Sequence, residues 1–97
     1  MNSIPLALDL LEGQISMAYQ ANTDFEKAAV FAATITLVKD LEAEIGETNP
    51  YALENLERAR WHTCAIVGYD VDNGHDASMH RSWASSAVKT LRDLLIK

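Results

Sequence analysis

Pro5-Leu-Ala-Leu-Asp-Leu-Leu-Glu12 returns 45 positions later as Pro50-Tyr-Ala-Leu-Glu-Asn-Leu-Glu57, and five of the eight residues are identical. A second correspondence, at a spacing of 50 positions, joins Val38, Lys39 and Leu41 to Val88, Lys89 and Leu91. The spacing grows because the second connecting loop is longer. Two related halves of this kind indicate an internal repeat.

Each half has the apolar periodicity of a helical hairpin. Because one helical hairpin cannot bury its apolar face, two stacked copies form the smallest closed unit. We therefore predict a single all-α domain over residues 1–97. Its architecture is an antiparallel four-helix bundle built from two pseudo-repeated helical hairpins, residues 3–46 and residues 49–97.

Start and stop signals place the helices of the first hairpin. Ser3 is the expected cap of a helix over residues 4–20, and Pro5 is tolerated in its first turn, where a missing N–H costs little. The sequence Thr23-Asp-Phe-Glu26 is a capping box. It predicts a second helix that ends near Gly46.

Similar signals place the second hairpin. Asn49 precedes a helix that is expected to reach about Gly68. Residues 69–75 form the long turn, in which Asn73-Gly74 is a reversal signal. Asp76 then caps a fourth helix that runs almost to the C-terminus.

Apolar stripes with a 3.6-residue period predict the core side chains. In the second helix the stripe consists of Val30, Ala33, Leu37, Leu41 and Ile45. In the fourth helix it consists of Ala77, Ala84, Ala87, Val88, Leu91, Leu94 and Leu95.

The charge is unevenly distributed. The chain has a net charge of −6, and all of it falls in residues 1–49. An acidic protein is repelled by nucleic acid and by anionic membranes, so direct binding to either is not expected. No apolar run approaches the roughly 20 residues that span a bilayer, and no secretory signal is present. Together with the single cysteine, these features predict a cytoplasmic protein without a membrane segment.

Four acidic residues crowd the end of the second helix, namely Asp40, Glu42, Glu44 and Glu47. They lie at the negative pole of the helix dipole, so helix stability does not explain them. Two explanations stay open: the charge serves solubility, or it meets a basic protein partner.

The second helix also lacks charge on every face between Ala28 and Val38. Ala28, Ala32 and Ile35 form a line of mostly small side chains opposite the core stripe. A helix that is apolar all round is normally buried on all sides. The pattern predicts either a homodimer through this helix or a helix central to an irregular bundle.

The third helix carries aromatic and charged side chains on its outer face. Tyr51, Arg58, His62 and Tyr69 form this face, and Trp61 and Trp83 lie at the margins of their apolar stripes. A solvated helix face and aromatic covers of the bundle end are the simplest explanations. The alternative is a partner surface, because tryptophan, tyrosine and arginine are enriched at interface anchors.

Few residues are candidates for chemistry, and no catalytic, cofactor or metal site is predicted. The candidates are His62, Cys64, His75, Asp76 and His80. Two or three scattered ligands do not make a metal site. Convergence of three or more of them on one partly buried cleft would favour an enzyme over a binding protein.

The expected function is that of a small, acidic, non-enzymatic interaction or regulatory protein. It would bind another protein through an apolar helix face with an acidic rim. One alternative is an inhibitor of the kind found in phages and mobile elements, which imitates nucleic acid on a nucleic-acid-binding protein. A small metal-dependent enzyme is the third hypothesis.

Overall fold

The computed structural model describes residues 3–69 and 74–96, and these residues are almost entirely helical. The elements are α1 (Ile4–Gln20), α2 (Asp24–Ile45), the short 3-10 helix η1 (Gly46–Thr48), α3 (Pro50–Ile66) and α4 (Ala77–Leu95). No strand occurs in these two ranges. The all-α prediction is confirmed, and the helix packing fits a bundle.

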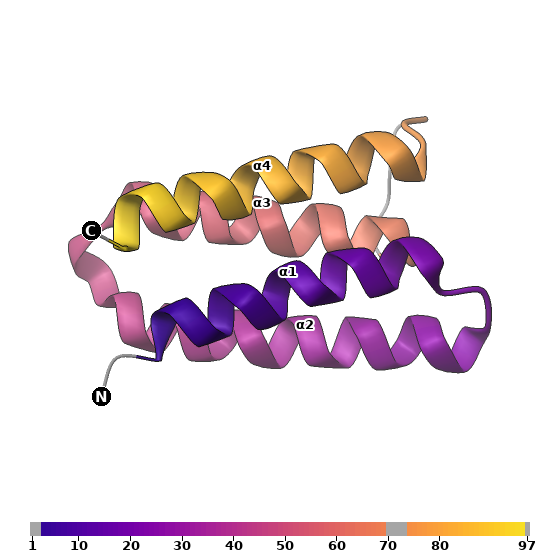
Figure 1. The fold of residues 1–97 in the computed structure, drawn as a ribbon, viewed down its shortest axis with the longest axis horizontal. Coiled ribbons are helices and arrows are strands. Elements are labelled where there is room, and N and C mark those ends of the chain that lie inside the picture. Colours follow the sequence, from indigo (N-terminus) through magenta and orange to yellow (C-terminus); the bar gives the residue numbers. More distant parts are fainter. Residues whose placement is uncertain (1–2, 70–73, 97) are drawn as a thin grey trace.

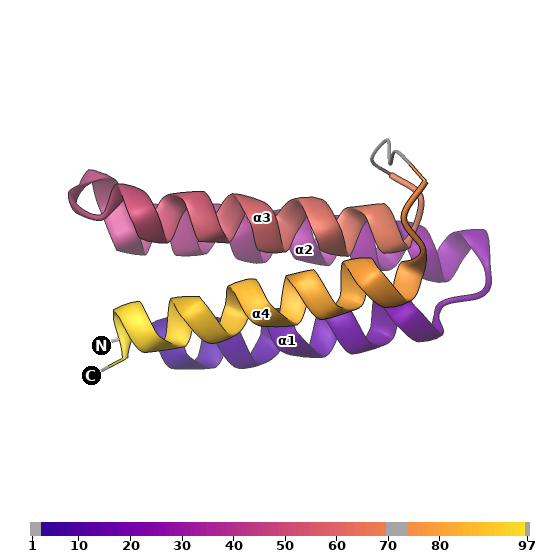
Figure 2. The same ribbon diagram turned by 90° about the horizontal axis from the view of Figure 1, so that it is seen from above.

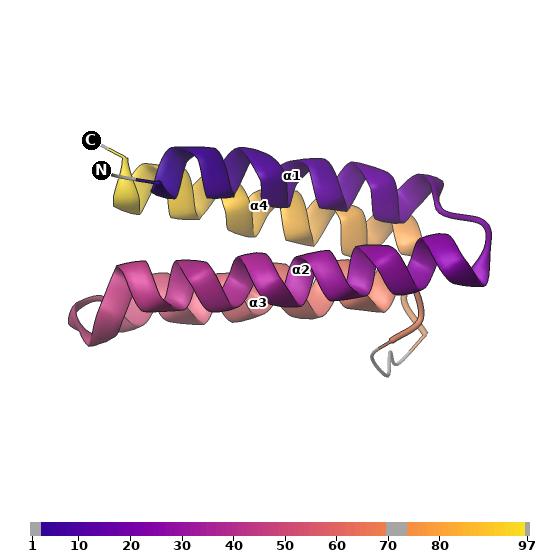
Figure 3. The same ribbon diagram turned by 90° about the horizontal axis from the view of Figure 1, so that it is seen from below.

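The helices pack as two pairs. α1 contacts α2 and α4, and α3 contacts α2 and α4. Figure 1 shows the α3 and α4 pair above the α1 and α2 pair, with both chain ends at the same end of the molecule. α3 and α4 lie in front in the view from above (Figure 2), and α1 and α2 in the view from below (Figure 3). The molecule therefore has an α1/α2 side and an opposite α3/α4 side.

The capping box at the start of α2 is formed as predicted. The Glu26 N–H donates to Thr23 Oγ1 at 3.1 Å, and the Thr23 N–H donates to Glu26 Oε1 at 3.1 Å. These two bonds satisfy backbone donors that the first turn of a helix leaves without partners. At the other end, Gly46 is the C-cap with a positive φ of 67°, a conformation that glycine adopts without strain.

Caps also open α3 and α4 where the sequence predicts them. The Asn49 side chain accepts a hydrogen bond from the Ala52 N–H at 3.1 Å. The Asp76 side chain accepts one from the Met79 N–H at 2.9 Å. The expected turn before α4 includes residues 70–73, which lie outside the described residues.

Ser3 departs from its predicted role. It occupies the cap position of α1, but its backbone is helical and its side chain makes no cap hydrogen bond. Instead the Ser3 hydroxyl donates to Glu44 Oε1 at 3.4 Å. The prediction of a side-chain cap is wrong here because the hydroxyl is directed toward the end of α2.

The capping box makes part of the stability depend on pH. Hydrogen bonds from the Asn22 N–H, and then from the Thr23 hydroxyl and N–H, lower the pKa of Glu26. A lowered folded-state pKa stabilises the fold fully above the ordinary carboxyl value of about 4.3, and this stabilisation is lost as pH falls through the folded value. Glu26→Gln keeps an accepting oxygen but removes the titration. We expect urea midpoints measured from pH 7 to pH 3 to fall less steeply for Glu26→Gln than for wild type. Parallel curves would contradict this assignment.

One core extends along the bundle and receives side chains from all four helices. Its buried members are Leu8, Leu11, Ile15, Val38, Leu41, Ile45, Ala52, Leu56, Ala59, Ala84, Ala87, Val88 and Leu91. A smaller cluster consists of Ala18, Val30 and Val67. No helix of the described residues is long and apolar enough to cross a membrane.

The buried line of α2 differs from the predicted stripe. Thr34 and Val38 are buried, whereas Ala33 and Leu37 are only half-buried. Val30, Leu41 and Ile45 are buried as predicted, so only the middle of the buried line is shifted, by one residue, where the helix packs between α1 and α3. The predicted core position of Ala77 in α4 is also wrong, since this residue is exposed at the start of the helix.

An ion-pair cluster joins α4 to α1. The Arg92 guanidinium contacts Glu12 and lies 2.8 Å from Asp9 Oδ1. The hydrogen bonds to Glu12 and then to Asp9 raise the pKa of Arg92 above its ordinary value. Two of the acids of the first hairpin therefore share one positive charge within the fold.

Candidate functional site

The outward side of α1 is apolar. Leu6, Leu10 and Met17 are 63%, 49% and 55% exposed. Together with Gly13 they recur at helical spacing along one side of the helix. Large exposed apolar side chains gathered on one helix side are typical of a binding surface, whereas scattered ones are not.

The outward side of α2 continues this surface. Phe25 is 83% exposed, the largest exposed fraction among the large apolar residues of the described chain. Ala28 and Ala32 are exposed and Ile35 is half-buried. The irregular-bundle alternative required the single chain to enclose α2 on all sides, and the exposed Ala28 and Ala32 show that it does not. The uncharged side of this helix faces solvent.

A hollow of about 550 Å³ lies between the two helices. Met17 lines it from α1, and Phe25, Ala29 and Ala33 line it from α2. We call the exposed surface formed by Leu6, Leu10, Gly13, Met17, Phe25, Ala29 and Ala33 the α1/α2 face.

Gly13 lies in the middle of the outward side of α1. A Cβ atom built on Gly13 meets nothing within 4 Å. The packing of this chain therefore does not require glycine at a mid-helix position, where glycine costs roughly 0.5–1 kcal/mol relative to alanine. The absent side chain leaves the α1 backbone open to close approach from outside.

Asp40, Glu42 and Glu44 of α2 are exposed, and so is Glu47, which lies in η1 just beyond it. Among the described residues, none of the ion pairs involves Asp40, Glu42, Glu44 or Glu47. No basic residue lies in the last turn of α2 to offset the helix dipole. They differ in this respect from Asp9 and Glu12, which both pair with Arg92.

Helical spacing divides these acids between two sides of α2. Asp40 and Glu44 follow Ala33 by seven and eleven residues, so they continue its side of the helix. The contact between Ser3 and Glu44 places that side next to α1. Glu42 follows Ile35 by seven residues and belongs to the neighbouring side. The carboxylates of Asp40 and Glu44 thus border one end of the α1/α2 face.

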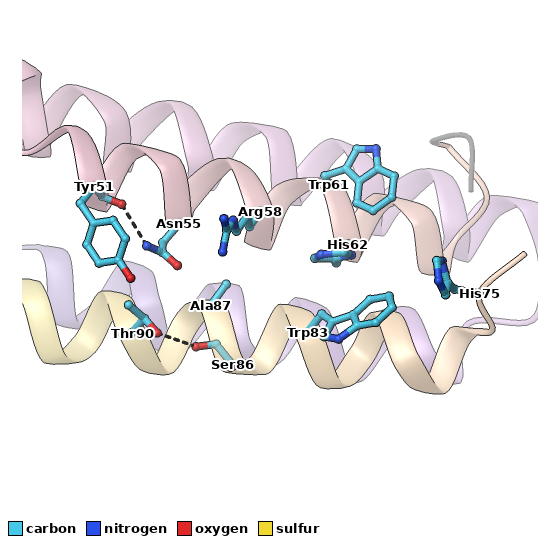
Figure 4. Close-up of a pocket in the computed structure, with 10 residues that line it drawn as sticks. All are labelled: Tyr51, Asn55, Arg58, Trp61, His62, His75, Trp83, Ser86, Ala87 and Thr90. Atoms are coloured by element: carbon cyan, nitrogen blue, oxygen red, sulfur yellow. Dashed lines mark hydrogen bonds between the residues drawn. The ribbon is translucent and has the colours of Figure 1, made fainter. Parts of the chain in front are cut away.

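A groove of about 460 Å³ occupies the opposite side of the molecule, between α3 and α4 (Figure 4). From α3 it is lined by Tyr51, Asn55, Arg58, Trp61 and His62. The remaining lining residues are His75, Trp83, Ser86, Ala87 and Thr90. We call this hollow the α3/α4 groove.

Histidine and tryptophan rings pack against one another at one end of the groove. The Nδ1 atoms of His62 and His80 are 2.9 Å apart. The ring of Trp61 lies 4.7 Å from His62, and the ring of Trp83 lies 5.2 Å from it on the other helix. His75 contacts Trp83 at a ring distance of 5.0 Å. Figure 4 shows His62 between the two tryptophans.

The contact between His62 and His80 constrains both rings. A hydrogen bond between two ring nitrogens needs a hydrogen on one and a lone pair on the other. His80 is 2% exposed, so the bond ties a buried ring of α4 to a half-buried ring of α3. The two tryptophans contact His62 from either side of it.

The structure brings together most of the predicted outer face of α3. Tyr51, Arg58, Trp61 and His62 all line the α3/α4 groove. Tyr69 does not, because its ring stacks on Phe31 of α2 at a centroid distance of 4.4 Å. That stacking places Tyr69 on the side where α3 meets α2.

The candidates for chemistry converge only in part. Three histidines, His62, His75 and His80, gather around Trp83, but of these His62 and His75 line the α3/α4 groove and the buried His80 does not. Cys64 is buried and Asp76 caps α4. In residues 3–69 and 74–96, no three histidine, cysteine or carboxylate side chains are placed to hold one metal ion.

Several residues of the two surfaces were not predicted from the sequence. Leu6 and Met17 were not singled out, although the spacing of Leu6, Leu10, Gly13 and Met17 is a second periodic signal on α1. Ser86 and Thr90 carry no signal of their own. They line the α3/α4 groove only because of the register between α3 and α4.

Comparison with known proteins gave no match to a family model, to a curated protein or to a solved structure. Function is therefore inferred from the two surfaces alone.

Proposed function

We propose that this chain is a small, acidic, non-enzymatic interaction protein that binds another protein through its α1/α2 face. The partner presents an amphipathic helix with an apolar side and basic residues at one end. The exposure of Phe25, at 83%, carries this proposal. Aromatic side chains dominate interface energetics, and leaving one in solvent forgoes the free energy of burying it.

Gly13 supports a helix as the occupant. Glycine lowers the stability of α1, and no contact within the chain requires it. A partner helix that packs over this position gains close backbone approach, as small residues allow wherever helices cross at short distance. The stability that Gly13 costs the free chain is then offset by the closer packing of the partner helix in the complex.

Charge favours a basic partner over a second copy of the chain. Asp40 and Glu44 border one end of the face and have no ion pair among the described residues, so they attract and orient a basic segment. Two copies each carry −6 and repel one another at long range. A homodimer through this face remains a possible outcome of the experiment below.

The test uses a synthetic amphipathic peptide of about 14 residues, four helical turns, made of leucine and lysine. We expect calorimetric titration to detect binding to the wild-type chain and none for the matched leucine and glutamate peptide. Phe25→Ala should weaken binding about tenfold, because it removes the exposed anchor. Neutralising Asp40, Glu42 and Glu44 should slow association and flatten its salt dependence.

Two further variants sharpen this experiment. Gly13→Ala should raise the thermal midpoint of the free chain while weakening peptide binding, and a merely structural glycine would not produce these opposite changes. Tyr51→Ala, on the opposite side, is the control and should leave binding unchanged. Equal binding of both peptides, or full binding by Phe25→Ala, would remove the proposal. A dimer in sedimentation that Phe25→Ala dissociates would assign the face to a second copy.

The nucleic-acid mimic is a second candidate, favoured by the exposed and unneutralised acids at the end of α2. In that case the chain competes with DNA for a nucleic-acid-binding protein, and binding of the leucine and lysine peptide does not depend on Phe25.

A small metal-dependent enzyme is the third candidate, favoured by the gathering of His62, His75 and His80. Metal analysis of the purified protein discriminates it.

We also infer that the bundle is antiparallel and that its two hairpins are pseudo-repeats. α1 and α3 each contain 17 residues and each have proline in the first turn. An experimental structure in which residues 5–45 superpose on residues 50–95 is the expected result.

A further inference from the structure

The α3/α4 groove has a charge character opposite to that of the whole chain. The chain carries −6, yet among residues 3–69 and 74–96 no carboxylate lines this groove. Its charged or titratable lining consists of Arg58, His62 and His75, with the Tyr51 phenol near one end. Arg58 is its charged member, since histidine counts as neutral in the net charge. A positive group in a concave site attracts ligands of the opposite sign. The lining therefore favours an anionic ligand.

The walls of the groove favour a flat ring. Trp61 on α3 and Trp83 on α4 both line it, and each contacts His62 between them. The contact between His62 and His80 joins α3 to α4 beside these rings in the chain without a ligand. Preorganised aromatic walls bind planar groups by stacking or edge contacts with little loss of side-chain freedom.

Arg58 is placed to bind the charge. Its Nη2 lies 3.0 Å from Glu54 Oε1, in a pair whose side chains are 60% and 57% exposed. An exposed pair of this kind contributes little stability, so a carboxylate or phosphate in the groove can replace it. Guanidinium binds both anions through two parallel hydrogen bonds, which lysine does not provide.

We propose that the α3/α4 groove binds a small molecule that combines an aromatic ring with a carboxylate or a phosphate. Arg58 binds the anion, and Trp61 and Trp83 contact the ring. A volume of about 460 Å³ is within the range of small-molecule sites. The groove lies on the side opposite the α1/α2 face, so this inference does not rest on the proposed function.

The two tryptophans allow a direct test. The chain contains only two, and both line the groove, so tryptophan emission reports on this site. The full chain is titrated with phenyl phosphate, phenylacetate, benzyl alcohol and inorganic phosphate. We expect phenyl phosphate or phenylacetate to change the emission saturably. Benzyl alcohol supplies the ring without the charge, and inorganic phosphate the charge without the ring. Each should bind at least tenfold more weakly than the better aromatic anion.

Variants assign the contacts. Arg58→Gln should weaken binding of the better aromatic anion about tenfold and leave binding of benzyl alcohol unchanged. Lys39→Gln is the matched control, since it removes one positive charge from α2 and should change neither. Trp83→Phe should reduce the emission change while the circular dichroism of the helices is kept.

Three results would overturn the proposal. The first is the absence of a saturable change with either aromatic anion. The second is benzyl alcohol binding as tightly as the anions. The third is equal binding by wild type and Arg58→Gln, with Arg58→Gln shown to be folded by circular dichroism.

Discussion

Leu11→Ala is expected to lower the free energy of unfolding by about 2–5 kcal/mol. Leu11 is 0% exposed and belongs to the core shared by all four helices. The substitution removes the transfer free energy of the buried side chain and leaves a cavity that a densely packed core fills only in part. Domains of this size have a total stability of roughly 5–15 kcal/mol, so the variant approaches the limit of folding.

Leu10→Ala is the matched control for this prediction. It makes the same change on the adjacent residue of α1, where the side chain is 49% exposed. We expect a change of about 0.5 kcal/mol or less in the unfolding free energy, as for other surface sites. Urea unfolding followed by circular dichroism measures both variants. Equal losses of stability in the two variants would show that the Leu11 side chain does not face the core.

Ala59→Leu is expected to destabilise the fold by about 1–3 kcal/mol through overpacking. Ala59 is 0% exposed and shares the core with Ala84 and Ala87 of α4. Small side chains at these positions allow α3 and α4 to lie close together. A leucine at position 59 has no cavity to enter, so its added atoms force neighbouring side chains or helices to move.

Ala43→Leu is the control, because it introduces the same side chain at an exposed alanine of α2. Leucine is nearly as good a helix former as alanine, so the expected change in unfolding free energy is below about 0.5 kcal/mol. Thermal and urea unfolding of both variants give the comparison. An Ala59→Leu variant as stable as wild type would mean that α3 and α4 are not closely packed at this position.

The starts of three helices were predictable residue by residue. Thr23, Asn49 and Asp76 each form the expected cap bond. Such bonds join groups only three residues apart, so local sequence contains everything that they need. The predicted side-chain cap at Ser3 was wrong because its hydroxyl bonds to Glu44, 41 positions away. Local sequence does not contain a contact of that range.

The middle of the buried line of α2 was not predictable to one residue. Leu37 and Val38 are both apolar, and no charge between Ala28 and Val38 marks the outer side of the helix. Packing against α1 and α3 selects Val38 and Thr34. The same lack of charge left open whether a second chain covers Ala28 and Ala32.

The sequence predicted no groove between α3 and α4, although it indicated most of the residues of one wall. Tyr51, Arg58 and His62 recur at helical spacing on α3, which the sequence reveals. Their neighbours Trp83 and Thr90 come from α4, and His80 is a buried polar residue that no stripe indicated. Pairing residues across two helices depends on their relative register, which the periodicity of either helix alone does not contain.

The sequence by itself determined that this chain is all-helical, where its helices begin, and that its net charge lies in residues 1–49. These properties follow from composition, from 3.6-residue periodicity and from bonds between near neighbours. Only the tertiary structure decided that Phe25 remains exposed, that Arg92 pairs with Asp9 and Glu12, and that His62 contacts His80. Each of these depends on how helices distant in sequence pack together, and packing is settled by the shape and volume of all four helices at once.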